Sequence, residues 1–153
     1  MTRFTLALYQ NDSEPLNKDA QLKALAKAAQ SAAMANAKLL ITPELYMSGY
    51  KIPDAVEGVA EPQDGAFLEQ AGAIARDNGI ALLIGYPEQS DEGVYNSAAL
   101  KDDTGKLVLN HRKLHLSGPY EKAHFITDNN DVQLAEIGGI KVCLLYTSDA
   151  ADD

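Results

Sequence analysis

The sequence is poor in cysteine and has no long apolar run. Cys143 is the single cysteine among 153 residues, which excludes a disulfide within the chain and fits a reducing, cytoplasmic location. The longest apolar runs, such as Ile80 to Tyr86, are far shorter than the roughly 20 residues that span a membrane. The start of the chain leads directly into strand-like sequence, so we expect no cleaved apolar leader.

Basic residues and ligand-binding motifs are also scarce. Thirteen Lys and Arg stand against 22 Asp and Glu, which gives a formal net charge of −9. Because nucleic acids and anionic membranes are bound through basic patches, we expect neither as a partner. His115 and His124 fit no zinc spacing, and the chain has no glycine-rich phosphate loop and no Gly-x-Ser-x-Gly elbow. We therefore expect no metal and no cofactor.

The first part of the chain has the pattern of alternating strands and helices. Residues 3–9, 38–42 and 80–86 are predicted strands, because their apolar residues alternate or form short continuous runs. Asn17 and Asp64 can each cap a helix, and the second helix should end at Gly79. Residues 51–63, with two prolines and one glycine, are a predicted ordered loop.

The later part of the chain is predicted to hold strands without helices. Residues 94–101 and 107–112 flank a good turn, and residues 132–137 and 140–145 flank a Gly-Gly pair, so both predict hairpins. Between the hairpins, residues 117–130 are a predicted long polar loop. A β-α-β-α-β order followed by hairpins indicates an α/β (α+β layered) fold, in which helices cover a sheet.

Two residues at the ends of predicted strands could carry chemistry. Glu44 follows a buried strand and Pro43, where a partly desolvated carboxylate suits proton transfer. Lys113 ends another strand, and alternation turns it away from Arg112, so it could stabilise an oxyanion in a pocket. Each also fits a simpler interpretation, as a solvated strand-end carboxylate or as a charge that protects an edge strand.

The order of several segments resembles the nitrilase superfamily of carbon–nitrogen hydrolases. Residues 39–50 (LLITPELYMSGY) are similar to the segment around its catalytic glutamate, and residues 95–98 (YNSA) to its Tyr-Asn-Ser strand. Residues 111–116 (HRKLHL) resemble the segment that bears its catalytic lysine. Glu121, followed by Phe125, matches the second glutamate and the aromatic residue of the next loop. The likeness extends over roughly residues 3 to 142, with all motifs in order.

The resemblance implies an α-β-β-α sandwich, a homo-oligomer, and hydrolysis of a non-peptide amide or nitrile without metal or cofactor. In such a mechanism a cysteine thiolate attacks the substrate carbon, a glutamate transfers the proton, and a lysine stabilises the oxyanion. Carried over to this sequence, Glu44 is the base, Lys113 is the oxyanion partner, and Glu121 orients the substrate or Lys113. A small amide is a better candidate substrate than a nitrile, because most family members of this kind hydrolyse amides.

The family's nucleophilic cysteine has no counterpart at the expected position. Alignment of Lys141 and Val142 with the start of the family's Val-Gly-Leu-Leu-Ile-Cys-Tyr-Asp strand places Thr147 there. Cys143 stands four residues earlier, which is about 13 Å along a strand and too far for attack. A threonine hydroxyl is far less acidic than a thiol and needs its own base. The chain as written is therefore expected to be inactive.

The last residues suggest why the cysteine is missing. Residues 143–153 (CLLYTSDAADD) lose strand character after Tyr146 and resemble translated sequencing-adapter sequence. We expect a truncated carbon–nitrogen hydrolase domain over residues 1–142 and a non-native tail over residues 143–153. The alternative is an inactive paralogue with a genuine acidic tail, which would be a non-catalytic nitrilase-like protein for binding or dimerisation.

Overall fold

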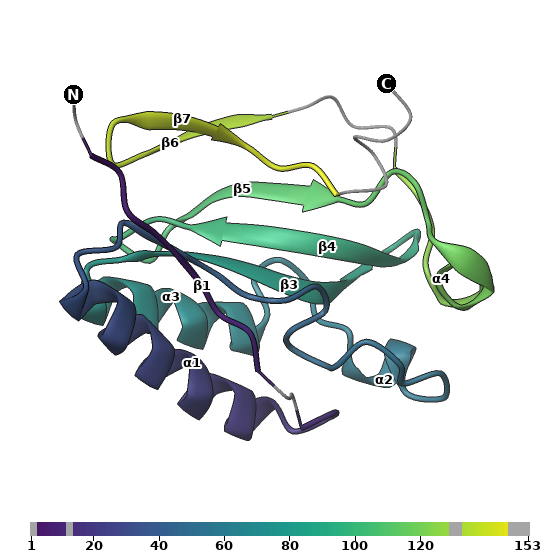
Figure 1. The fold of residues 1–153 in the computed structure, drawn as a ribbon. Coiled ribbons are helices and arrows are strands. Elements are labelled where there is room, and N and C mark those ends of the chain that lie inside the picture. The colour runs from purple at the N-terminus through teal and green to yellow at the C-terminus, as the bar shows by residue number, and fades with distance from the viewer. Residues whose placement is uncertain (1–2, 12–13, 129–132, 147–153) are drawn as a thin grey trace.

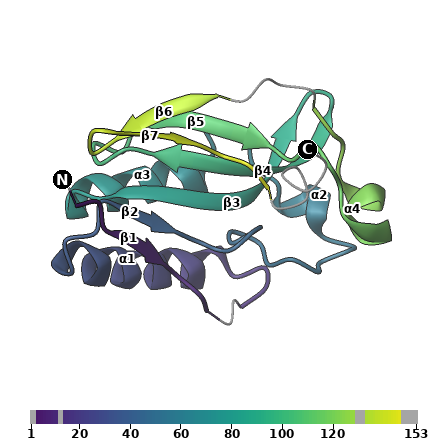
Figure 2. The same cartoon turned by 45° about the horizontal axis from the view of Figure 1, so that its top comes forward.

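A five-stranded mixed sheet forms the centre of the protein (Figures 1 and 2). The structure is a computed structural model that describes residues 3–11, 14–128 and 133–146. The strand order is β1-β2-β3-β4-β5. Strands β1 (Leu6–Leu8), β2 (Leu39–Ile41) and β3 (Ala81–Ser90) are parallel, whereas β4 (Gly93–Lys101) and β5 (Leu107–Arg112) follow in antiparallel pairing. The predicted α/β class with a helix-covered sheet is confirmed.

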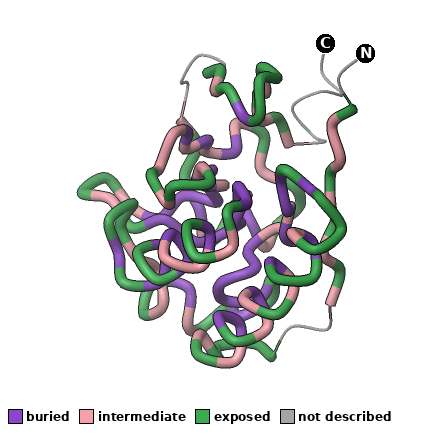
Figure 3. Tube along the Cα trace, turned by 90° about the vertical axis from the view of Figure 1, so that its left-hand side faces the viewer, coloured by how far each residue is buried: buried purple, intermediate pink, exposed green. Residues whose placement is uncertain are grey.

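The two faces of this sheet are covered differently. Helices α1 (Lys18–Met34) and α3 (Ala66–Asn78) lie on one face, and the hairpin of β6 (Leu134–Ile137) and β7 (Ile140–Cys143) lies on the other (Figure 1). The larger apolar core lies between the helices and the sheet, and a smaller one lies under the hairpin. The buried stretches therefore run through the middle of the chain trace, with exposed stretches outside (Figure 3). The fully buried side chains of the larger core include Leu25, Phe67, Leu68, Leu82, Ile84 and Tyr86.

Local sequence explains the bounds of the helices. The side chain of Asn17 accepts a hydrogen bond from the Ala20 amide and caps α1, as predicted. Helix α3 ends at Gly79, which has the left-handed φ of 60° that favours glycine. Asp64 is not the cap of α3, so that prediction is wrong: Gly65 is the N-cap, and the Phe67 amide donates instead to Glu61 Oε2 at 2.8 Å.

Two predicted loops contain short helices. Helix α2 (Val56–Val59) lies within residues 51–63, and α4 (Gly118–His124) lies within the segment 117–130, which is therefore not a simple loop. Both helices lie beyond one end of the sheet (Figures 1 and 2). A third apolar cluster fixes them there and consists of Leu45, Ile52, Val56, Val94 and Phe125.

The β3–β4 hairpin is not among the two hairpins that the sequence pattern predicts. Strand β3 continues through Pro87 to Ser90, and β4 returns from Gly93 in unbroken register with it. Asn96 on β4 lies opposite Pro87 as a result. Among the described residues, no helix combines the length and the apolar character required to cross a bilayer.

Candidate active site

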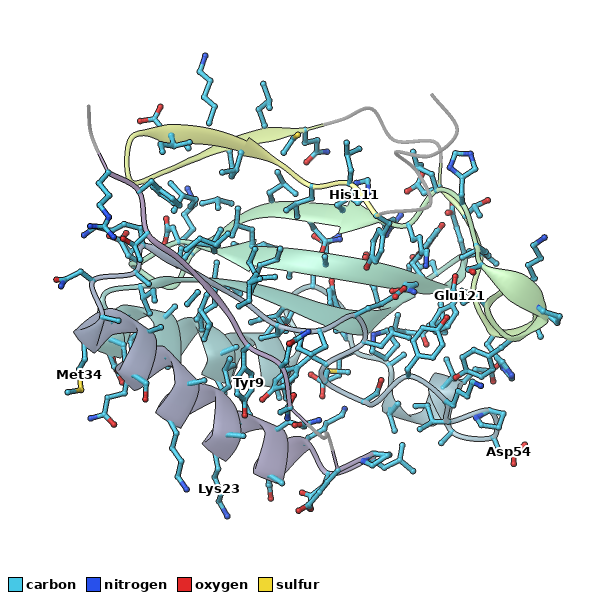
Figure 4. The ribbon with its side chains drawn as sticks, viewed as in Figure 1. Tyr9, Lys23, Met34, Asp54, His111 and Glu121 are labelled. Carbon is cyan, nitrogen blue, oxygen red and sulfur yellow. The ribbon has the colours of Figure 1, made fainter. Side chains whose placement is uncertain are left out.

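Lys113 lies at the centre of a buried group of charges at the end of the sheet. Its side chain is 5% exposed, and its Nζ lies 2.8 Å from Glu44 Oε1 and 3.0 Å from Glu121 Oε1. The three residues selected from the sequence come from different parts of the chain, and the fold brings them into direct contact. Figure 4 shows Glu121 on the side of α4 that faces the sheet.

A tight turn after β2 positions Glu44. Pro43 ends the strand, and Leu45 has a positive φ of 50°, which turns the chain sharply at Glu44. Gly85 on β3 allows this turn to approach the sheet, because a Cβ atom there would lie 2.6 Å from the Leu45 amide nitrogen and from the Pro43 carbonyl oxygen. The Glu44 side chain stays 32% exposed, so its carboxylate contacts solvent as well as Lys113.

Helix α4 positions Glu121, which is completely buried. Its Oε1 accepts hydrogen bonds from Tyr50 and Lys113, and its Oε2 accepts one from the Ser117 amide at 2.7 Å. Burial by itself raises the pKa of Glu121, but the donors at Tyr50, Ser117 and Lys113 outweigh it and hold this pKa below its ordinary value. The carboxylate is therefore ionised at neutral pH.

The same balance keeps Lys113 charged. Desolvation lowers the pKa of Lys113, but the hydrogen bonds and charges of Glu44 and Glu121 raise it above the ordinary lysine value. A lysine in this state is no proton donor or base near pH 7. It is a fixed positive charge, which suits the stabilisation of an oxyanion.

Asn96 is part of the site, although no role was predicted for it beyond the Tyr-Asn-Ser resemblance. It is completely buried on β4, and its Nδ2 donates to Glu44 Oε1 at 2.7 Å. Its backbone carbonyl also accepts the Lys113 amide at 2.8 Å. An asparagine in the middle of a largely apolar strand was the available signal, since a buried polar group needs polar partners.

The residue beside Lys113 belongs to a separate network on the other face of β5. Arg112 donates to Glu88 Oε1 at 2.6 Å and to Asp128 Oδ2 at 2.7 Å, and its guanidinium lies 3.8 Å from the centre of the Tyr95 ring. Arg112 and Lys113 thus point in opposite directions, as strand alternation predicts. Glu88 is only 1% exposed, so this ion pair anchors the end of β5 from which Lys113 projects.

A cavity of about 310 Å³ opens beside Glu44, between the sheet and the segment after β7. Tyr146 forms part of its wall; the Tyr146 ring centre lies 5.0 Å from Lys113 Nζ, and its hydroxyl donates to Asn96 Oδ1 at 3.1 Å. His111, labelled in Figure 4, lines the same cavity and stacks on Tyr146. The other lining residues are Thr42, Pro43, Leu83, Gly85, Ala98, Leu144 and Leu145.

The structure does not bring the single cysteine into this group. Cys143 is exposed on β7 opposite Leu134, and it does not line the cavity beside Glu44. Thr147, which stands at the expected nucleophile position, lies outside the described residues. Within the part of the chain that the structure describes, no cluster of three or more His, Cys, Asp or Glu could hold a metal ion.

A family model and several curated proteins match this chain. The family model described as carbon-nitrogen hydrolase matches residues 5–146. A hydrolase from the pqqF 5′ region of Pseudomonas protegens is 39% identical over 146 residues, which cover 94% of this chain and 50% of that protein. The omega-amidase NIT2 of Xenopus tropicalis is 32% identical over 117 residues, which cover 76% of this chain and 42% of that protein. The chain spans about half the length of the curated relatives it matches.

A solved amidase has the same fold. A variant of the amidase from Nesterenkonia sp. AN1 in complex with butyramide matches with a TM-score of 0.85 at 33% identity, over 93% of this chain and 55% of that chain. A second variant of that amidase is in complex with acrylamide, and a third carries acrylamide added at its active site cysteine. The match confirms the predicted nitrilase-like architecture.

Proposed function

Because this chain belongs to the carbon-nitrogen hydrolase family, we propose that its site is built to hydrolyse the C–N bond of a small non-peptide amide. The observation that carries this proposal is the buried Lys113 ammonium, bound by Glu44 and Glu121 at 2.8 and 3.0 Å. One carboxylate is partly open to solvent and available for proton transfer, whereas the other is buried and fully hydrogen-bonded. That division suits one base and one positioning group.

Each residue has a distinct step in the proposed reaction. Glu44 removes the proton from a cysteine thiol, and the sulfur forms a bond to the carbonyl carbon of the amide. Lys113 stabilises the negative charge that develops on the carbonyl oxygen. Glu44 then returns the proton to the nitrogen, the C–N bond breaks, and ammonia leaves. A water molecule activated by Glu44 hydrolyses the thioester, while Glu121 keeps Lys113 in place.

A small aliphatic amide is the substrate class that we favour over a nitrile. Variants of the Nesterenkonia amidase, which match at a TM-score of 0.85, are in complex with acrylamide and with butyramide.

We also propose that the chain as written does not complete this reaction, because its cysteine does not line the cavity beside Glu44. The test is ammonia release from butyramide by the unmodified chain and by Cys143→Ala. We expect no release above background from either protein. Release that Cys143→Ala abolishes would show that Cys143 is the nucleophile and that the alignment with Thr147 is wrong.

A cysteine installed at position 147 tests the site more directly. In a Cys143→Ala background, Thr147→Cys should add acrylamide faster than Cys143 does in the unmodified chain, and a further Glu44→Gln change should remove that advantage. Butyramide binding without reaction in both backgrounds would favour the non-catalytic alternative. The nucleotide sequence after codon 142 tests the proposed boundary: a homologous frame that continues to Ile-Cys-Tyr-Asp supports it, whereas a native stop codon after Asp153 contradicts it.

A further inference from the structure

The two oxygens of the Glu44 carboxylate have different surroundings. Oε1 accepts from Lys113 Nζ at 2.8 Å and from Asn96 Nδ2 at 2.7 Å. No residue in the described part of the chain donates to Oε2, and the side chain is 32% exposed. One oxygen is therefore bound by two donors, and the other is open.

We infer that Asn96 is a positioning residue that selects Glu44 Oε2 as the oxygen that exchanges protons with substrate. This inference rests on the proposed role of Glu44 as the base. Lys113 alone binds Oε1 at a single point, about which the carboxylate can still rotate. A second donor from a different strand fixes the plane of the carboxylate and directs Oε2 outward.

Asn96 is well suited to this task because its own orientation is fixed. Its amide is completely buried, and its Oδ1 accepts the Tyr146 hydroxyl at 3.1 Å. The reverse orientation of the amide would place Oδ1 against the Glu44 carboxylate, where two acceptors repel each other. The arrangement therefore holds for the Nδ2 contact whether or not residue 146 is a tyrosine.

Asn96 also ties the base to the oxyanion partner. Its side chain binds Glu44, and its backbone carbonyl accepts the Lys113 amide at 2.8 Å. The pairing of Ser97 with Arg112 in the β4–β5 ladder fixes this register. One residue thus sets the relative position of the two groups that act on different atoms of the same substrate amide.

The test reads the Glu44 side chain directly and needs no turnover. Three-bond NMR couplings give the χ1 and χ2 rotamer populations of Glu44 in the unmodified chain and in Asn96→Leu. We expect one dominant rotamer in the unmodified chain and averaging over several rotamers in Asn96→Leu. The matched control is Ser97→Ala, because Ser97 is equally buried on the same strand but donates to Glu88 Oε2 at 2.6 Å. This control should retain the single Glu44 rotamer.

If Asn96→Leu does not fold, the hydrogen bond between Asn96 Nδ2 and Glu44 Oε1 can be tested by a change at Glu44 instead. One Asn96 Nδ2 proton should be protected from solvent exchange in the unmodified chain and should lose that protection in Glu44→Leu, whose change is at a partly exposed side chain. A Glu44 rotamer that survives Asn96→Leu, or an Nδ2 proton unaffected by Glu44→Leu, would overturn the inference. Neither measurement depends on a nucleophile, so failure of the amidase proposal leaves them interpretable.

Discussion

Replacement of Lys113 by methionine should destabilise the protein by about 3 kcal/mol at neutral pH. The substitution keeps most of the apolar stem and removes the ammonium, which leaves Glu121 ionised and completely buried without its cation. Loss of one partner from a buried ion pair typically costs about 3–5 kcal/mol. We take the lower end because Glu121 keeps its bonds from Tyr50 and Ser117, and because Glu44 regains water at its exposed side.

Urea unfolding followed by circular dichroism measures this change, and two further variants control it. Arg76→Met removes a cation whose side chain is 61% exposed beside Asp77, so we expect a change of less than about 0.5 kcal/mol. Glu121→Gln combined with Lys113→Met removes the uncompensated charge, so the double variant should be more stable than Lys113→Met alone. A Lys113→Met protein within about 1 kcal/mol of the unmodified chain, with no gain in the double variant, would refute this account.

The difference in unfolding free energy between the unmodified chain and Lys113→Met should depend on pH. Because the folded pKa of Glu121 is lowered, its contribution is present above the unfolded value of about 4.3 and is lost as the pH falls through the folded value. The folded pKa of Lys113 is raised, so its contribution is present up to about pH 10 and is lost at higher pH. The stability difference between the unmodified chain and Lys113→Met should therefore shrink below about pH 4 and above about pH 10.

Three further outcomes are expected. Gly72→Ala should destabilise the protein by about 1–3 kcal/mol in urea unfolding, because its Cβ would lie 2.6 Å from the Gly105 carbonyl oxygen. An unchanged stability would mean that the turn at Gly105 can move away from α3. Cys143 should react with a maleimide at the rate of a free exposed thiol, and a much faster reaction would indicate an activating environment. Arg112→Met should lower the free energy of unfolding by about 3 kcal/mol because Glu88 is buried, and the added change Glu88→Gln should partly restore it. Equal stabilities of the unmodified chain, Arg112→Met and the double variant would contradict an anchoring role.

The sequence predicted the first three strands and two helices well because their signals are local. Short apolar runs, the Asn17 cap and the left-handed Gly79 each act within a few residues. The β3–β4 hairpin escaped prediction because Pro87 lacks an N–H and normally argues against a continuing strand. The structure accommodates Pro87 in the ladder opposite Asn96, and this depends on a partner strand that no local pattern identifies.

Helix α4 escaped prediction for a different reason. Residues 117–130 have neither apolar periodicity nor a long run of strong helix formers. The helix depends on contacts made elsewhere: the buried Glu121 carboxylate accepts the Ser117 amide, and Phe125 packs in the cluster with Leu45 and Val94. Such a helix exists because the tertiary structure satisfies its polar groups, and single-sequence reasoning has no access to that.

The charges of the site satisfy one another through residues that the structure describes. Lys113 has two carboxylate acceptors, Glu121 has three donors, and Glu44 Oε1 has two. Charged groups that are mutually paired stay in place when a neighbour is altered, whereas an unpaired buried charge would rearrange. A chain without the nucleophile should therefore keep the geometry of base and oxyanion partner. Amide binding and amide cleavage then become separable measurements, because the first needs only this arrangement and the second also needs a thiol beside Glu44.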